Sequence, residues 1–455
     1  MSSVLAMLFL VLFSTLAIGF YSASSMSAQI ARNEQSMALA QAGADAGMQY
    51  LRYQFNQMTI PPNPPDLLTA AANALGPSTG QGLNGTSLMN GGSVTVTNGA
   101  IYIPSATGWT NVDPNAGTKF RAMIVASGQF LVCTVDGAGP NGTILKGIQL
   151  KYQTAPKAGA ILDYGVANEG TVTTAGSTVI QGLTDPTKGS VLSADMSSAT
   201  PVVIDGKSVS GDISVVNPSA TISVSGASIG GTSDPTQIPK HEHIGVPAPS
   251  FPTIDTSVFT QYATTQYNAS MSTLTNVYIP PNTNPKFTGG VTIYGVLWVQ
   301  QPNTVTFRGN CTICGIIVGN PPSMVQTYDP VNNVISFAGN VSATTIDQLP
   351  STVPNYAALQ KLTGSFMLVP GFSVSMTGNF GTLGGSMVVG SLSMSGNAGG
   401  TVDGSVIGMT DNPLSLNGHS SITISSTGTT NYPSGMSFGN SYTPLPGTYQ
   451  EVTPW

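Results

Sequence analysis

The stretch VLAMLFLVLFSTLAIGFY, residues 4–21, decides the first element of the fold. It is an uncharged apolar run close to the roughly 17–25 residues that a helix needs to cross a bilayer. Residues 22–56 continue without proline and with apolar residues at helical spacing, and the first breaker is Pro61. We therefore expect one continuous helix of roughly 80 Å, apolar at its start and amphipathic afterwards.

The large apolar side chains of this run are the candidate contacts with a membrane or with the core of a filament. They are Val4, Leu5, Leu8, Phe9, Leu12, Phe13, Leu16 and Phe20. The residues alone leave three alternatives open: a signal peptide cleaved near Ser22-Ala23-Ser24, a simple signal anchor, and a buried helix of a soluble domain.

The composition narrows the class of protein. Only 7% of the 455 residues are charged, the net charge is −6, and the 13 Lys and Arg form no cluster. Electrostatic binding of nucleic acid is therefore excluded, and three cysteines do not make a disulfide scaffold. A surface of Ser, Thr, Asn and Gly favours an exported, β-rich protein with two or three domains.

A small β-rich head is expected after the helix. Residues 93–104 alternate between apolar and polar side chains around Asn98-Gly99, which is a hairpin signal. Residues 119–153 indicate three more strands, joined by turns at Ser127-Gly128 and at residues 136–142. Cys133, in the middle strand of the three, is expected to be a buried apolar filler.

Short strands with a repeating pattern, x-V-x-I/V-x-G-N, fill the chain from about residue 160 onward. Each strand has period two and ends at a residue that tolerates positive φ. This pattern predicts a right-handed β-helix-like solenoid, with a large β-sandwich as the alternative. The fold class is thus mainly β, with one long N-terminal α-helix, a small β head and a β-solenoid.

Composition shifts suggest five segments. They are a helix at 1–60, a head at 61–159, a first solenoid segment at 160–238, a Pro-rich linker with a short helix at 239–275, and a second solenoid segment at 276–455. With this division, removal of residues 1–56 is expected to leave a soluble, folded β protein.

Two stretches carry a family resemblance. QIARNEQSMALAQAGADAGMQYLRYQF, residues 29–55, resembles the second half of the N-terminal helix of PilX-type minor pilins. The stretch from Asn276 to Gly319 is similar to a block in large PilX-like proteins whose C-terminal domain is β-helical and has no assigned activity. The resemblance implies a type IV pilin-like subunit at the cell surface, anchored in the membrane or incorporated in a pilus.

Residues that could carry chemistry are few. His241 and His243 are a candidate metal pair, with a solvated linker as the alternative. Cys311 and Cys314 are expected to pack in the core, with a disulfide or a metal site as alternatives. The pairs Asp403 with Asp411 and Asp205 with Asp212 are the only carboxylate pairs that suggest acid–base catalysis. We assign no catalytic residue, no metal site and no cofactor.

The expected function is therefore structural: a non-enzymatic pilin-like surface or filament subunit that displays a β-helical domain for structure or adhesion. Its partners are the membrane, other pilin-like subunits including copies of itself, and an unidentified extracellular glycan or protein. The alternative is a membrane-anchored β-helix carbohydrate-active enzyme.

Overall fold

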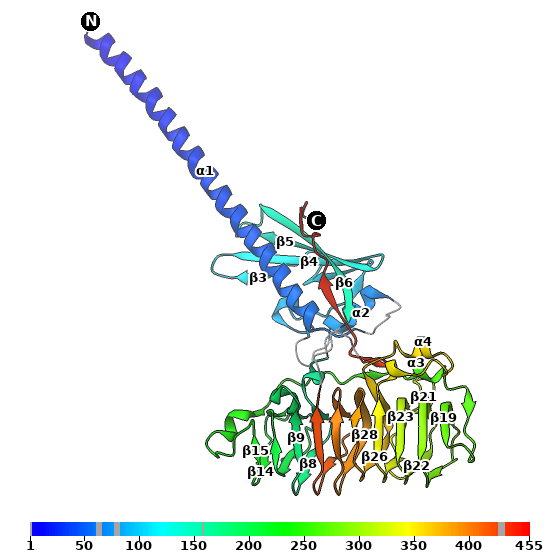
Figure 1. Cartoon of the computed structure of the whole chain (residues 1–455). Helices are drawn as coiled ribbons and strands as arrows, with labels where there is room; N and C mark the ends of the chain where they lie inside the picture. Colours follow the sequence, from blue (N-terminus) through cyan, green and yellow to red (C-terminus); the bar gives the residue numbers. More distant parts are fainter. Residues whose placement is uncertain (1, 61–65, 77–81, 157–158, 426–432) are drawn as a thin grey trace. The chain divides into compact units, whose positions relative to one another are not determined.

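The computed structural model describes residues 2–60, 66–76, 82–156, 159–425 and 433–455. These residues form two compact units, one of Met1–Lys157 with Gly439–Trp455 and one of Ala158–Phe438. The fold class is as expected: one long N-terminal helix precedes a head and a large body built of strands (Figure 1).

Helix α1, Ser2–Gln57, is continuous, as the sequence predicts. Its first half projects from the strands of the first unit, and its second half lies along them (Figure 1). Burial begins near Ala40 and then recurs at helical spacing. The buried positions are Ala40, Gly43, Ala44, Gly47, Met48, Leu51, Gln54 and Phe55.

Small residues set how closely α1 approaches the sheet. A Cβ at Gly47 would lie 2.5 Å from the ring of Phe120, and a Cβ at Gly137 would overlap the carbonyl oxygen of Ala40. The Ala- and Gly-rich composition of residues 40–47 is therefore a packing requirement, because larger side chains would hold the helix away from the sheet.

The head is an antiparallel sheet packed on α1 and on the short helix α2, Leu67–Leu75. The Asn98-Gly99 hairpin is confirmed: Thr97 pairs with Ala100, and the two turn residues have φ of 53° and 72°. The strands before the solenoid are β1 Val96–Thr97, β2 Ala100–Ile103, β3 Thr110–Asp113, β4 Thr118–Ser127, β5 Phe130–Ala138 and β6 Leu145–Pro156.

The end of the chain returns to the head. Strand β34, Asn440–Pro444, and strand β35, Gln450–Val452, both pair antiparallel with β6, and Asn440 lies opposite Pro156. The division that placed all of 276–455 in the solenoid is wrong for residues 439–455. Two short strands separated by Pro and Gly look like solenoid strands in the sequence, and only the pairing partner distinguishes them.

The second unit is a solenoid of stacked coils with three strands in a typical coil. Its first coil pairs in parallel with the second, and the second with the third. Parallel ladders with a constant register distinguish this arrangement from an antiparallel sandwich. The coils are β7 Val166–Asn168, β8 Val172–Ala175 and β9 Val179–Gly182; β10 Val191–Ser193, β11 Val202–Asp205 and β12 Ser208–Val209; and β13 Ile213–Val215, β14 Ile222–Val224 and β15 Ser228–Ile229.

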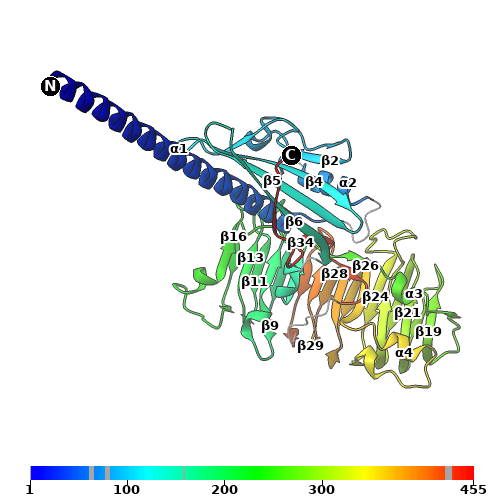
Figure 2. The ribbon, with the colours of Figure 1, turned by 90° about the horizontal axis from the view of Figure 1, so that it is seen from above.

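The later coils form a second arm that runs back to the first coil. Strands β30, β31 and β32 pair in parallel with β7, β8 and β9. The last coil therefore stacks on the first, and the two arms are one continuous stack (Figures 1 and 2). The strands of this arm are β18 Thr265–Gln266, β19 Thr273–Ile279, β20 Lys286–Phe287, β21 Val291–Val299, β22 Asn303–Phe307, β23 Cys311–Val318, β24 Asn333–Phe337, β25 Val341–Thr344, β26 Ser365–Met376, β27 Thr382–Leu383, β28 Ser386–Met394, β29 Gly399–Val402, β30 Val406–Gly408, β31 Leu414–Leu416 and β32 Ser421–Ile424.

Residues 239–275 connect the two ends of the stack. Strand β16, Glu242–Ile244, extends the first arm by pairing with β13, and β18 begins the second arm by pairing with β19. Between them, Ile254 and Phe259 pack on apolar side chains that point outward from the coils, such as Ile316. The expected linker is thus part of the solenoid. Its elements are β17 Thr253–Ile254, which pairs with β33 Met436–Ser437, and α3 Ser257–Thr260.

Short helical turns complete the structure. They are η1 Ser87–Met89 in the head, and η2 Ala160–Asp163, η3 Pro186–Gly189, η4 Ile238–His241, η5 Ile346–Gln348 and α4 Tyr356–Leu359 in the solenoid.

A column of three identical residues lies inside the second arm. Phe287, Phe307 and Phe337 stack with ring centroids 4.9 and 4.8 Å apart. At one corner a Cβ on Gly339 would overlap the carbonyl oxygen of Gly309 in the neighbouring coil. Neither glycine has a positive φ. The expectation that positive φ selects the glycine of the repeat is wrong at these positions, where close stacking of backbones selects it.

The close stacking at Gly339 predicts that alanine substitutions at two glycines of the same arm differ in their effect on stability. Gly339→Ala must push two coils apart, so it should lower the thermal midpoint of the solenoid by roughly 4 °C or more. Gly289→Ala should leave the midpoint nearly unchanged, because nothing lies within 4 Å of its added Cβ. Thermal unfolding followed by circular dichroism measures both, and equal midpoints would contradict the stacking argument.

The structure also changes where the N-terminal helix can be truncated without unfolding the head. Removal of residues 1–56 takes away Leu51 and Phe55, which are fully buried in the head, so this fragment should lose the head's fixed packing. Removal of residues 1–30 takes away only exposed side chains among those described and should leave both units folded. The backbone amides of β4–β6 should be protected from hydrogen exchange in the shorter deletion, and this protection should be lost in the longer one.

Candidate functional site

The exposed start of α1 is the main candidate site. Of the apolar set from the sequence, Leu5, Leu8, Phe9, Leu12, Phe13, Leu16 and Phe20 are each 52–70% exposed. The side chain of Val4 lies outside the described residues. Residues Met7–Gln57 contain a window long and apolar enough to cross a membrane, and none of that window is buried. A soluble protein rarely leaves such a continuous apolar surface uncovered.

The polar groups inside this segment are bonded to the helix itself. The hydroxyl of Ser14 donates to the carbonyl oxygen of Leu10 at 2.6 Å, and that of Thr15 donates to the carbonyl oxygen of Leu12 at 2.9 Å. Both hydroxyl donors are therefore satisfied without water, which suits an apolar environment.

A polar spacer separates this apolar segment from the head. Residues 22–35 remain exposed on all sides and include Arg32, Asn33 and Glu34. The apolar segment of residues 5–21 is roughly 26 Å long, close to the roughly 30 Å of a bilayer core. It is therefore long enough to be buried in lipid, or among neighbouring helices, without burying the charged residues.

The two histidines converge on one carboxylate. His241 Nδ1 lies 2.7 Å from Asp212 Oδ1, and His243 Nε2 lies 2.9 Å from Asp212 Oδ2. Burial opposes ionisation of Asp212, but hydrogen bonds from His241 and His243 outweigh it and lower the pKa of the carboxyl. Within the described ranges, no three His, Cys, Asp or Glu side chains are arranged to hold a metal.

The cysteines occupy different clusters. Cys311 points into the interior of the coils and Cys314 points to the outer apolar cluster, and neither is bonded to the other. The disulfide alternative is therefore wrong, because residues i and i+3 of one strand face opposite sides. Burial raises the pKa of Cys311 to about 12. Cys133 is fully buried in the head, as expected.

The carboxylates are not arranged as the sequence suggested. Asp403 accepts a hydrogen bond from Ser425 at 3.2 Å, whereas Asp411 lies close to Glu169. Burial raises the pKa of Glu169, and the charge of Asp411 adds to this shift. The neighbour of Asp411 belongs to the first coil, which the sequence did not place beside the last one.

A buried ion pair in the head was missed by the sequence analysis. Arg121 donates to Asp136 from Nε at 3.1 Å and from Nη2 at 2.9 Å. The guanidinium also lies 4.0 Å from the ring centroid of Trp455, whose backbone N–H donates to Asp136. This cluster fixes the C-terminal residue to the sheet. The turn at Ser127-Gly128 already sets a register that places Arg121 opposite Asp136.

Comparison with known proteins finds matches among solved structures. No protein-family model and no curated protein matches the chain. The structure of the competence-associated pilin ComZ from Thermus thermophilus aligns over 92% of this chain and 97% of its own, with 10% identity and a TM-score of 0.27. At that TM-score the match supports no argument about this chain, and the fold rests on its own helix and strand pairings.

The contacts of His241 and His243 with Asp212 are expected to stabilise β16 against local unfolding. Asp212→Asn removes the anion that both histidines share, so amide exchange in β16 should speed up about three- to fivefold; the effect is modest because the carboxylate is half exposed. Asp205→Asn, which removes an exposed carboxylate of β11, should have no effect. Because the folded pKa of Asp212 is lowered from 3.8, its contribution is present above that pH and is lost as the pH falls below it. Equal exchange in both variants at neutral pH would contradict this role.

Proposed function

We propose that the chain is a non-enzymatic, pilin-like subunit of the cell surface that is anchored in the membrane or built into a filament by α1. The supporting observation is the uncovered apolar surface of residues 5–21 on an unbroken helix. Its burial in lipid, or against equivalent helices of further copies, removes apolar surface from water and supplies the driving force.

The solenoid is the part that such a subunit displays. Exposed positions of its strands carry hydroxyl and amide side chains, such as Gln181, Ser223 and Thr312, and only 7% of the residues of the chain are charged. A surface of this kind binds by hydrogen bonds rather than by charge attraction. We therefore propose an extracellular glycan or protein as the partner of the solenoid, with structure or adhesion as the outcome.

A pair of arginine substitutions on the same helix tests the role of α1. Phe13→Arg places a charge in the middle of the apolar segment, where insertion of Arg costs about 2.5–3.5 kcal/mol, so the partition coefficient between vesicles and water should fall roughly a hundredfold. Ser25→Arg adds the same charge to the polar spacer and should bind as the wild type does. Cosedimentation with lipid vesicles measures this difference.

Electron microscopy of labelled cells separates the two forms of the proposal. Label along filaments indicates assembly, and label confined to the cell envelope indicates anchorage. If Phe13→Arg kept both the vesicle binding and the surface label of the wild type, the proposed role of α1 would be refuted.

The non-enzymatic part has a separate test. The full-length chain should not turn over polysaccharides of different linkage types. Turnover that is abolished by Asp403→Ala or by Asp411→Ala would replace this part of the proposal with the carbohydrate-active enzyme.

A further inference from the structure

One column of inward-facing residues in the solenoid ends on a carboxylate. Val166, Val191 and Ile213 lie above one another in β7, β10 and β13, and all three are fully buried. The register then places Glu242 of β16 over Ile213. An acidic side chain thus occupies the inward position that the earlier coils of this arm give to Val or Ile. Such a departure from the pattern is typical of a functional position or a protected edge.

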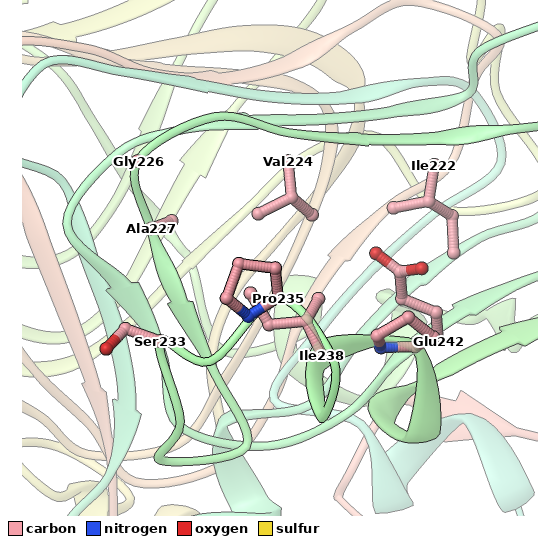
Figure 3. Close-up of a pocket in the computed structure, with 9 residues that line it drawn as sticks. Ile222, Val224, Gly226, Ala227, Ser233, Pro235, Ile238 and Glu242 are labelled. Carbon is pink, nitrogen blue, oxygen red and sulfur yellow. The ribbon is translucent and has the colours of Figure 1, made fainter.

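A cavity of about 450 Å³ lies beside this carboxylate. It lies at the end of the first arm, between β14 of the third coil and the chain that leads to β16. Figure 3 shows Glu242 directed toward the space beneath Ile222 and Val224. The volume is in the range of roughly 300–1,000 Å³ that small-ligand sites have. The remaining lining residues are Gly226, Ala227, Ser233, Pro235, Ile238 and Pro239.

Glu242 is the one ionisable group that lines the cavity, and the described residues give it no hydrogen bond or ion pair. The basic side chains close to it in the sequence have other partners. Lys240 donates a hydrogen bond to Gln237 at 2.7 Å, and both histidines face Asp212. Asp234, on the loop before η4, accepts hydrogen bonds from Thr236. Burial raises the pKa of Glu242. A carboxylate beside apolar walls, without a counter-charge, is stabilised by a cation that enters the cavity.

We propose that this pocket binds an alkylammonium group, with its carbon chain against Ile222, Val224 and Ile238 and its charged nitrogen at the Glu242 carboxylate. A free alkylamine and a lysine side chain of another polypeptide offer the same chemistry. The proposal concerns the end of the solenoid and does not depend on the role of α1.

Methyl NMR of the full-length chain in detergent micelles tests this binding. Titration with butylammonium should shift the methyl signals of Ile222 and Ile238, whereas Ile101 in the head serves as the internal control. Butanol, which has nearly the same shape and no charge, should bind at least tenfold more weakly. Glu242→Gln should weaken butylammonium binding by at least tenfold, and Glu451→Gln, which removes an exposed carboxylate of the head, should not.

Three further measurements identify the source of the ligand and the location of its site. A blocked lysine, Nα-acetyl-lysine N-methylamide, should compete with butylammonium if the pocket accepts a protein side chain, and failure to compete assigns the site to free amines. Ser233→Phe at the rim should weaken both ligands. Because burial raises the pKa of Glu242 above 4.5, affinity should fall on acidification, and the fall should begin at a higher pH than for an ordinary glutamate.

The outcomes that overturn the proposal are equally definite. They are equal affinity for butanol and butylammonium, unchanged affinity in Glu242→Gln, or methyl shifts that do not include Ile222 and Ile238.

Discussion

The parallel ladder between the first and the last coil is the interaction on which the solenoid depends. Val406 pairs with Val166 and Leu414 pairs with Val172, across some 240 residues of sequence. Without it, each arm would expose an open coil edge and the end of its buried columns. With it, entry and exit of the chain meet: Gly159 lies against the ring of Phe438, and Pro156 pairs with Asn440 in the head. The solenoid is thus an insertion between two neighbouring strands of the head.

Features with local physical causes could be predicted from the sequence. An uncharged apolar run followed by a proline-free segment predicts the continuous α1, because helix formation depends on residues three and four apart. The Asn98-Gly99 turn has the positive φ angles that its residue types favour. The period-two strands with Gly-Asn ends predict a repeat structure, since each coil repeats the same local requirements.

Features that depend on long-range pairing could not be predicted. Nothing local distinguishes β34, which joins the head, from the solenoid strands before it. The order of the coils is equally hidden, so the sequence suggests Asp403 as the neighbour of Asp411, whereas Glu169 is the carboxylate close to it. The sequence shows His241 and His243 as a pair, but their partner Asp212 lies in the preceding coil. Gly339 fits the Gly-Asn strand end of the repeat, but the contact that requires glycine there is with Gly309, thirty positions away.

A stack that is entered at its middle leaves both terminal coils without a covalent connection to the head. Each terminal coil must then be protected from pairing with another copy, and an inward charge is one known means of protection. Glu242 provides this charge. It lies three coil steps, roughly 14 Å, from Val166 in the first coil. The same carboxylate that blocks a further apolar coil leaves a cavity beside it and gives that cavity a charge. Edge protection and a cation-binding pocket are therefore two consequences of one substitution in the repeat.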